Sequence, residues 1–280
     1  MRGLIDVGGG MRDVYGAGVL DSFLDNGIRF DYCIGVSAGS GNIASFIAGQ
    51  RLRNYRFYTI YSMRKEYMSR SNFLHKGSYF DLDYIYSTLT EEGGEDALDT
   101  AAMYRSPTEF YVAATEAVTG QTVFFPKTKI RPHDLSVVKA SCAMPAVCKP
   151  VSVDGRLYYD GGVGDPIPIR KALKDGCDEV WVILTRPRDY VDQPIGHKRA
   201  YQFILRYYPA IVKEIGERHQ KYNLEVEVLK ELEQQGKVVI VAPTKTCGVG
   251  TTSRDKTLLD ALYQVGYEDA KDLLEQRKMV

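Results

Sequence analysis

Two short apolar segments near the N-terminus each end in a glycine-containing turn that leads directly into a helical pattern. Residues 2–7 read RGLIDV and precede three glycines, after which apolar residues recur at helical spacing until Asn26-Gly27. Residues 30–36 form a second such segment, and the small residues of 38–50 continue from it as a helix. A strand followed at once by a tight turn and a helix constrains this chain to an α/β arrangement.

Further strand-sized apolar segments alternate with helical patterns along the chain. Because helices that alternate with strands cover both faces of a parallel sheet, we expect a three-layer α/β/α sandwich with a mostly parallel central sheet. Thr119-Gly120 and Asp154-Gly155 each separate two strand patterns and predict hairpins, which add some antiparallel pairing. The predicted strands are 109–115, 122–126, 178–185 and 237–243, and the predicted helices include 133–142, 168–175, 208–235 and 255–277.

No low-complexity linker or internal repeat divides the sequence. We therefore expect a single domain over residues 1–280, with its core motifs in 1–170 and a helix-rich C-terminal extension from about 190.

Charge and apolar run length exclude several classes of protein. Lys+Arg and Asp+Glu number 36 each, so the chain lacks the positive field that attracts nucleic acid, and we expect no nucleic-acid partner. The longest apolar runs are far shorter than the roughly 20 residues that span a bilayer.

The N-terminal segment reaches glycines before an apolar region of useful length, which predicts no secretory signal and a cytoplasmic location. The five cysteines form no CxxC pair, which argues against a disulfide framework and a zinc site.

The pentapeptide Gly35-Val36-Ser37-Ala38-Gly39 lies between the second predicted strand and its helix. A Gly-x-Ser-x-Gly turn in this position holds the serine in a strained conformation and presents its hydroxyl as a nucleophile. The alternative is that Ser37 only caps the helix, and the motif alone does not decide between the two.

Gly8-Gly9-Gly10 follow the first predicted strand and precede a helix. Consecutive peptide N–H groups without side chains can converge on an anion, which suits either an oxyanion hole or a phosphate site. A dinucleotide site is the weaker alternative, because the third glycine position of that motif holds Asp13 and the expected ribose-binding acid is replaced by the Ser37 turn.

A nucleophilic serine needs a base. His197 and His219 lie in charged helical stretches, where a solvated histidine is the expected state. Asp160 ends a predicted hairpin strand, and Gly161 and Gly162 after it would allow close approach to another backbone. An isolated Asp-Gly pair also suits an ordinary turn.

In this order, GGGMR before a helix that ends AGVLDSFL, then GVSAG, then DGG resemble the patatin-like phospholipase family. The similarity extends through most of the chain. The resemblance implies a Ser–Asp catalytic dyad, a glycine-rich oxyanion hole, lipid or lysolipid acyl esters as substrates, and neither a metal nor another cofactor. The implied residues are Ser37 and Asp160 for the dyad, the N–H groups of Gly8, Gly9, Gly10, Met11 and Arg12 for the oxyanion hole, and Gly35, Gly39, Gly161 and Gly162 as supporting glycines.

The sequence departs from the family pattern at Asp13, where the family usually has glycine. A carboxylate beside an oxyanion would repel it. If the side chain points away, it instead caps or charges the first helical turn favourably.

We therefore expect a serine acyl hydrolase of the phospholipase A or lysophospholipase kind that forms an acyl-enzyme on Ser37. The alternative is a non-catalytic or weakly active protein of the same fold that binds lipid or protein, and Asp13 is its best support.

Residues 51–76 carry seven Lys/Arg against one Glu, interleaved with aromatic residues. This mixture suits contact with anionic head groups and peripheral association with a membrane. A solvated helix with its aromatic residues turned inward explains the pattern equally well. Two further arginines follow a strand, where open α/β sheets bind ligands, although ordinary surface charge is the alternative. The candidate head-group contacts are Arg51, Arg53, Arg56, Arg186 and Arg188.

Overall fold

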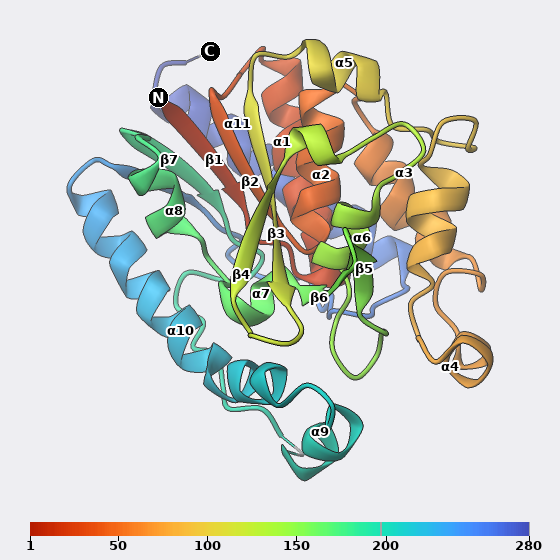
Figure 1. Cartoon of the computed structure of the whole chain (residues 1–280). Coiled ribbons are helices and arrows are strands. Elements are labelled where there is room, and N and C mark those ends of the chain that lie inside the picture. The colour runs from red at the N-terminus through yellow and green to blue at the C-terminus, as the bar shows by residue number, and fades with distance from the viewer. Residues whose placement is uncertain (197, 280) are drawn as a thin grey trace.

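The computed structural model describes residues 1–196 and 198–279, which form an eight-stranded sheet with helices on both faces (Figure 1). Five adjacent strands are parallel and make up most of the sheet. In spatial order they are β3 (Glu109–Glu116), β2 (Tyr32–Val36), β1 (Arg2–Asp6), β7 (Glu179–Ile183) and β8 (Val238–Val241). The α/β/α architecture predicted from the alternating patterns is therefore confirmed.

Three antiparallel strands complete the sheet beside β3. They are β4 (Thr122–Pro126), β5 (Val151–Val153) and β6 (Arg156–Asp160), and they form the two hairpins predicted at Thr119-Gly120 and Asp154-Gly155.

The pairing around β3 brings two strand ends together. Thr115 of β3 pairs with β4 on one side and with β6 on the other, so β6 lies along the same edge of β3 as β2. Strand β2 ends at Val36 opposite Ala113, and β6 ends at Asp160 opposite the next residue, Ala114. The carboxyl ends of β2 and β6 therefore meet head to head, and the residues that follow them become neighbours.

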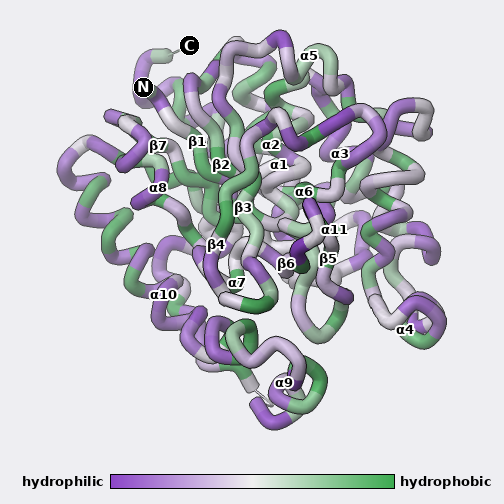
Figure 2. The backbone as a smooth tube through the Cα atoms, in the orientation of Figure 1, coloured by the Kyte–Doolittle hydropathy of each residue, from purple (hydrophilic) through white to green (hydrophobic). Residues whose placement is uncertain are grey.

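The central strands are mostly apolar and are buried along almost their whole length, because helices cover both faces (Figure 2). Leu4 packs into a core with α1 (Val14–Asp25), α2 (Ala38–Ile47) and α11 (Lys256–Gln276). Its neighbour Ile5 points to the opposite face and packs with α8 (Ile169–Lys174) and α10 (Pro209–Gln234). The two faces of the sheet thus have separate cores.

The C-terminal helix α11 packs directly against α1. A Cβ at Gly18 would lie 2.1 Å from the carbonyl oxygen of Tyr263, and a Cβ at Gly266 would lie 2.1 Å from that of Tyr15. The two backbones approach so closely that neither glycine can be replaced without displacing a helix.

Shorter helices occupy the connections at the edges of the sheet. Among the residues that the structure describes, no helix is both long and apolar enough to cross a bilayer. These shorter elements are a 3-10 turn (Gly10–Asp13), α3 (Arg53–Thr59), α4 (Arg70–Lys76), a π-helical segment (Tyr84–Leu89), α5 (Thr100–Arg105), α6 (Ser136–Ser141), α7 (Gly161–Gly164) and α9 (Lys198–Ile204).

Candidate active site

Ser37 occupies the sharp turn between β2 and α2. Its φ of 54° and ψ of −131° lie in a region that residues with a Cβ rarely adopt. Its N–H donates to Oγ of Ser141 over 2.9 Å, and its carbonyl oxygen accepts from Oγ of Ser40 over 2.6 Å. At Gly35 and Gly39 an added Cβ would lie 2.4 Å from neighbouring backbone atoms, so both glycines are needed for the turn to pack. The strained turn is therefore held from several sides.

Asp160 accepts a hydrogen bond from the hydroxyl of Ser37. Oγ of Ser37 donates to Oδ2 of Asp160 over 2.6 Å, and Oδ1 accepts from the N–H of Gly162 over 2.8 Å. Asp160 is only 6% exposed, and this burial raises its pKa to about 6, against the lowering effect of the two hydrogen bonds. Gly161 allows the close approach, because a Cβ there would lie 2.3 Å from the carbonyl oxygen of Ala113. The carboxylate is thus a stronger base than an ordinary aspartate and is still ionised at neutral pH.

The three consecutive glycines after β1 form a loop beside Ser37, with φ values of 67°, 145° and 61°. All three values favour glycine strongly. Oγ1 of Thr185, just beyond β7, donates to the carbonyl oxygen of Gly8 over 2.6 Å. An added Cβ at Gly9 would lie 2.4 Å from the same hydroxyl, so the loop and the end of β7 fit together only without a side chain there.

Only some of the N–H groups of this loop are free. The N–H of Gly8 donates to Oδ1 of Asp6 over 3.1 Å, and the N–H of Met11 donates to the carbonyl oxygen of Thr251 over 3.0 Å. Within the described residues, the N–H groups of Gly9 and Gly10 donate to no protein group. Both glycines line the same pocket as the Ser37 hydroxyl.

Comparison with known proteins shows which family this chain belongs to. Residues 7–173, more than half of the chain, match the family model described as patatin-like phospholipase. The chain belongs to the patatin-like phospholipase family. The resemblance inferred from the ordered motifs is confirmed. Residues 208–279 match a second family model, described as a domain of unknown function (DUF6363).

The individual proteins that match this patatin-like phospholipase family member have moderate to low sequence identity with it. The uncharacterized protein YjjU of Escherichia coli K12 is 31% identical over 204 residues, which are 72% of this chain and 56% of YjjU. Lysophospholipase NTE1 of Candida albicans is 25% identical over 182 residues, 64% of this chain and 12% of NTE1. The chain therefore spans only part of the length of these curated relatives. The crystal structure of VipD from Legionella pneumophila aligns with 98% of this chain and 67% of its own, at a TM-score of 0.49 and 14% identity.

Two pockets of contrasting chemistry meet at Ser37. One of them, which we call the arginine-lined pocket, lies on the side of β7 and α10. The other, which we call the apolar pocket, lies on the side of α3 and the π-helical segment. Ser37, Gly10 and Met144 border both. Polar residues of the arginine-lined pocket include Arg12, Thr185, Arg186, Tyr190, Asp192, Arg218 and Thr251, whereas the apolar pocket is lined by Met11, Phe57, Tyr67, Phe80, Leu82, Tyr86 and Cys142.

Arg186, a candidate head-group contact, lines the arginine-lined pocket. Its guanidinium stacks over the ring of Tyr190, 4.4 Å from the ring centre. Arg12, expected to contribute only its N–H group, also directs its side chain to this pocket. Burial and the positive charges of Arg186 and Arg218 lower the pKa of Arg12 to about 10. Positive charge is therefore concentrated on one side of Ser37.

Arg218 is a pocket residue that the sequence did not single out. It lies on α10, where its Nε donates to the carbonyl oxygen of Gly162 over 2.8 Å and its Nη1 pairs with Asp192 over 2.6 Å. Its separation of 56 positions from Gly162 gave no local signal of this contact. A single arginine in a long charged helix resembles surface charge until the fold brings the helix to the pocket.

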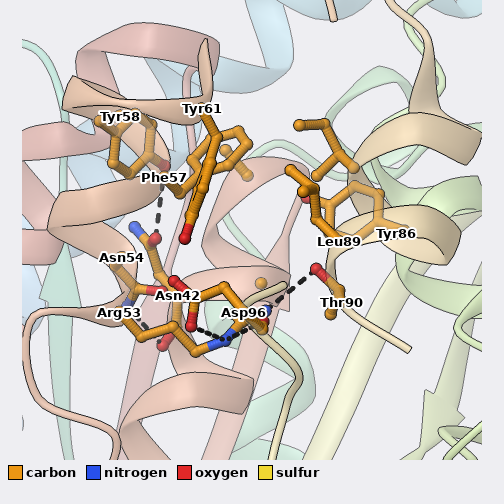
Figure 3. Close-up of a pocket in the computed structure, with 13 residues that line it drawn as sticks. Asn42, Arg53, Asn54, Phe57, Tyr58, Tyr61, Tyr86, Leu89, Thr90 and Asp96 are labelled. Carbon is orange, nitrogen blue, oxygen red and sulfur yellow. Dashed lines mark hydrogen bonds and ion pairs between the residues drawn. The ribbon is translucent and has the colours of Figure 1, made fainter. Parts of the chain in front are cut away.

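Three of the candidate head-group contacts are engaged with carboxylates away from Ser37. Arg51 forms a two-point ion pair with Asp25, one bond of which is 2.7 Å, and Arg56 pairs with Asp96 through two bonds of 2.8 Å. Arg53 is only 8% exposed and donates to the carbonyl oxygen of Asp96, inside a small separate pocket (Figure 3). These arginines neutralise local carboxylates and line neither pocket at Ser37.

Several aromatic residues of 51–76 also turn inward. Tyr58, Tyr61 and Tyr67 are buried, as the alternative of inward aromatic residues predicts, whereas Phe73 is 46% exposed. Arg188, the remaining expected contact, instead forms an ion pair with Glu233 and lines neither pocket at Ser37.

The three histidines that the structure describes lie away from the serine. His75, His133 and His219 line neither pocket at Ser37, and His197 lies outside the described residues.

Asp13 faces away from Ser37 and into the core. It is fully buried, makes no side-chain cap to α1, and lines neither pocket. Its carboxyl group lies beside that of Asp6. Among the described residues, neither of its oxygens has a hydrogen-bond donor. Burial and the charge of Asp6 raise the pKa of Asp13 well above its ordinary value, and burial raises the pKa of Asp6 to about 6. Burial and the charge of Asp6 therefore favour the protonated form of Asp13, and Oδ1 of Asp6 accepts the N–H of Gly8.

The raised pKa values of Asp6 and Asp13 make stability depend on pH. The folded pair holds protons that the unfolded chain releases near its ordinary aspartate pKa, so the free energy of unfolding falls as pH rises above that value. Asp13→Asn keeps a donor towards Asp6 but cannot ionise. We expect the variant to gain stability relative to the unmodified protein between pH 5 and 9, by up to about 1.4 kcal/mol for each pH unit.

Urea denaturation across that pH range measures the effect. The control is Asp189→Asn, which removes an exposed carboxylate and should give a curve parallel to that of the unmodified protein. A parallel curve for Asp13→Asn as well would show that Asp13 carries no additional proton.

Proposed function

We propose that this protein hydrolyses lipid acyl esters, with Ser37 as nucleophile and Asp160 as its base. The observation that carries the proposal is the 2.6 Å hydrogen bond from Oγ of Ser37, in a strained turn, to a buried carboxylate. The family match and the printed name of a lysophospholipase relative support the substrate class. We further propose that residues 1–280 act as one unit, because α10 and Thr251, which lies between β8 and α11, complete the arginine-lined pocket.

The reaction follows from the two side chains. Asp160 accepts the hydroxyl proton while Oγ of Ser37 attacks the ester carbonyl carbon and forms a tetrahedral oxyanion. Collapse of this intermediate breaks the ester C–O bond, and Asp160 returns the proton to the departing alcohol. Water then gives a proton to Asp160, attacks the acyl-enzyme, and releases the fatty acid as the proton returns to Ser37. Asp160 is suited to both directions because its pKa of about 6 lies near neutrality.

The free N–H groups of Gly9 and Gly10 are our candidates for the oxyanion hole. They border Ser37 and have no partner among the described protein groups. The N–H groups of Gly8 and Met11, which the motif also suggested, are already engaged. A donor of this kind stabilises the transition state of acyl transfer by about 3 kcal/mol.

The alternative of a non-catalytic binding protein loses its main support. It rested on repulsion between Asp13 and an oxyanion, but the Asp13 carboxyl lies in the core beside Asp6. The contacts of Ser37 and Asp160 are those that nucleophilic chemistry requires.

Replacing either member of the pair tests the proposal. We expect Ser37→Ala and Asp160→Asn each to lower kcat/KM on a soluble short-chain ester by at least about 1,000-fold, because each removes the activated nucleophile. His75→Ala, His133→Ala and His219→Ala should stay within about tenfold, since none of these histidines contacts the serine. Circular dichroism should confirm that all five variants are folded. A histidine variant as inactive as Ser37→Ala would show that a Ser–His mechanism operates instead.

The two pockets suggest how an amphipathic ester binds. We propose that the acyl chain occupies the apolar pocket and that an anionic head group faces Arg12, Arg186 and Arg218. Asp192 pairs with Arg218, whereas Arg12 and Arg186 form no ion pair among the described residues. Two positive charges therefore remain for a phosphate group.

Arg186→Gln tests the head-group contact. We expect it to raise KM at least about fivefold on a lysophospholipid with a phosphate head group, and to leave KM unchanged on a monoacylglycerol with the same chain. The matched control is Arg188→Gln, two residues away and paired with Glu233 outside the pocket, which should alter neither KM. An equal rise on both substrates would mean that Arg186 contributes structure and not charge recognition.

A further inference from the structure

The segment of residues 198–208, between β7 and α10, exposes an unusual amount of apolar surface. It comprises α9 and the turn that follows, with the sequence KRAYQFILRYY. Helix α9 buries none of its seven residues. Phe203 and Tyr207 are 72% and 74% exposed, and Ile204 is 49% exposed. Figure 1 shows α9 projecting from the end of the molecule where the parallel strands finish.

The inner side of this segment is firmly attached. Leu205 is buried in a core with Ile211 of α10, and the ring of Tyr208 packs edge-on against Tyr159, 5.5 Å between ring centres. Tyr201 lines the arginine-lined pocket that contains Ser37. These contacts fix the direction of the exposed side chains, and they place the segment at the rim of that pocket.

The charge of the segment is one-sided. Residues 198–208 contain three Lys/Arg and no Asp/Glu, although the whole chain is neutral. Lys198, Arg199 and Arg206 are exposed and form no ion pair among the described residues. The guanidinium of Arg206 lies 5.3 Å from the ring centre of Phe203 and 4.6 Å from that of Tyr207. Basic and aromatic groups therefore share one exposed surface.

We propose that residues 198–208 dock the protein on a membrane surface that carries anionic lipids. Phe203, Ile204 and Tyr207 enter the interface between head groups and acyl chains, and the basic residues neutralise lipid phosphates. Because Tyr201 connects this segment with the arginine-lined pocket, a lipid can pass from the bilayer towards Ser37 without crossing open solvent. This inference rests on the proposed lipid ester activity and replaces 51–76, where Arg51, Arg53 and Arg56 pair with carboxylates, as the membrane-facing region.

Vesicle sedimentation tests the docking segment independently of catalysis. The vesicles contain equal amounts of ether-linked phosphatidylglycerol and ether-linked phosphatidylcholine, which have no ester to hydrolyse. We expect the intact protein to bind these vesicles at least tenfold more tightly than vesicles of ether-linked phosphatidylcholine alone. The combined variant Phe203→Ser, Ile204→Ser, Tyr207→Ser should lose at least tenfold in affinity. The combined variant Lys198→Gln, Arg199→Gln, Arg206→Gln should lose the preference for the anionic vesicles.

Controls separate this proposal from the proposed activity. Leu224→Ser removes a 59% exposed apolar residue of α10 outside the segment and should bind as the intact protein does. All variants should retain the intact protein's rate on a soluble ester. Unchanged vesicle binding by both combined variants would overturn the docking proposal while leaving the hydrolase proposal intact. So would a concentration-dependent dimer that the apolar variant abolishes, without vesicle binding. Failure of the intact protein to cleave the soluble ester would overturn the hydrolase proposal alone.

Discussion

The hydrogen bond between Ser37 and Asp160 depends on two strands that end against each other. Strands β2 and β6 share one edge of β3 and approach it from opposite directions, so their last residues pair with the adjacent positions Ala113 and Ala114. The turn after each strand must then be tight, because the space beyond one strand is filled by the other. Small residues satisfy this requirement, and the strain at Ser37 is balanced by the packing of the parallel sheet around it.

Burial acts on the acidic groups of this region in two ways. Asp160 loses water but gains donors from Ser37 and Gly162, so its pKa rises only to about 6 and it is available as a base. Asp13 loses water without any matched donor and faces Asp6, so its pKa rises well above the ordinary aspartate value. The same desolvation therefore makes Asp160 a stronger base and favours the protonated form of Asp13. The number of donors around each carboxyl group decides the outcome.

Sequence reasoning predicted the features that are encoded locally. The strands, the hairpins and the turn at Ser37 follow from apolar runs and glycine positions within a few residues, and the ordered motifs pointed to Asp160 as its partner. Features that depend on tertiary contacts were missed. Arg218 reaches the pocket only because α10 folds back across the sheet, and Arg53 lies 3.7 Å from the carboxylate of Asp96, 43 positions away. Composition identified basic, aromatic-rich sequence but could not show which side chains turn inward.

The most direct test of the central claim is the pH dependence of covalent labelling at Ser37. A fluorophosphonate probe should form an adduct on Ser37, located by mass spectrometry of peptides. The rate should rise from pH 5 to pH 7 with a midpoint near 6, because Asp160 must be ionised to accept the hydroxyl proton. Asp160→Asn should abolish the labelling at every pH. A rate that does not change across this range, or an adduct on another residue, would contradict the assignment of Ser37 and Asp160 as nucleophile and base.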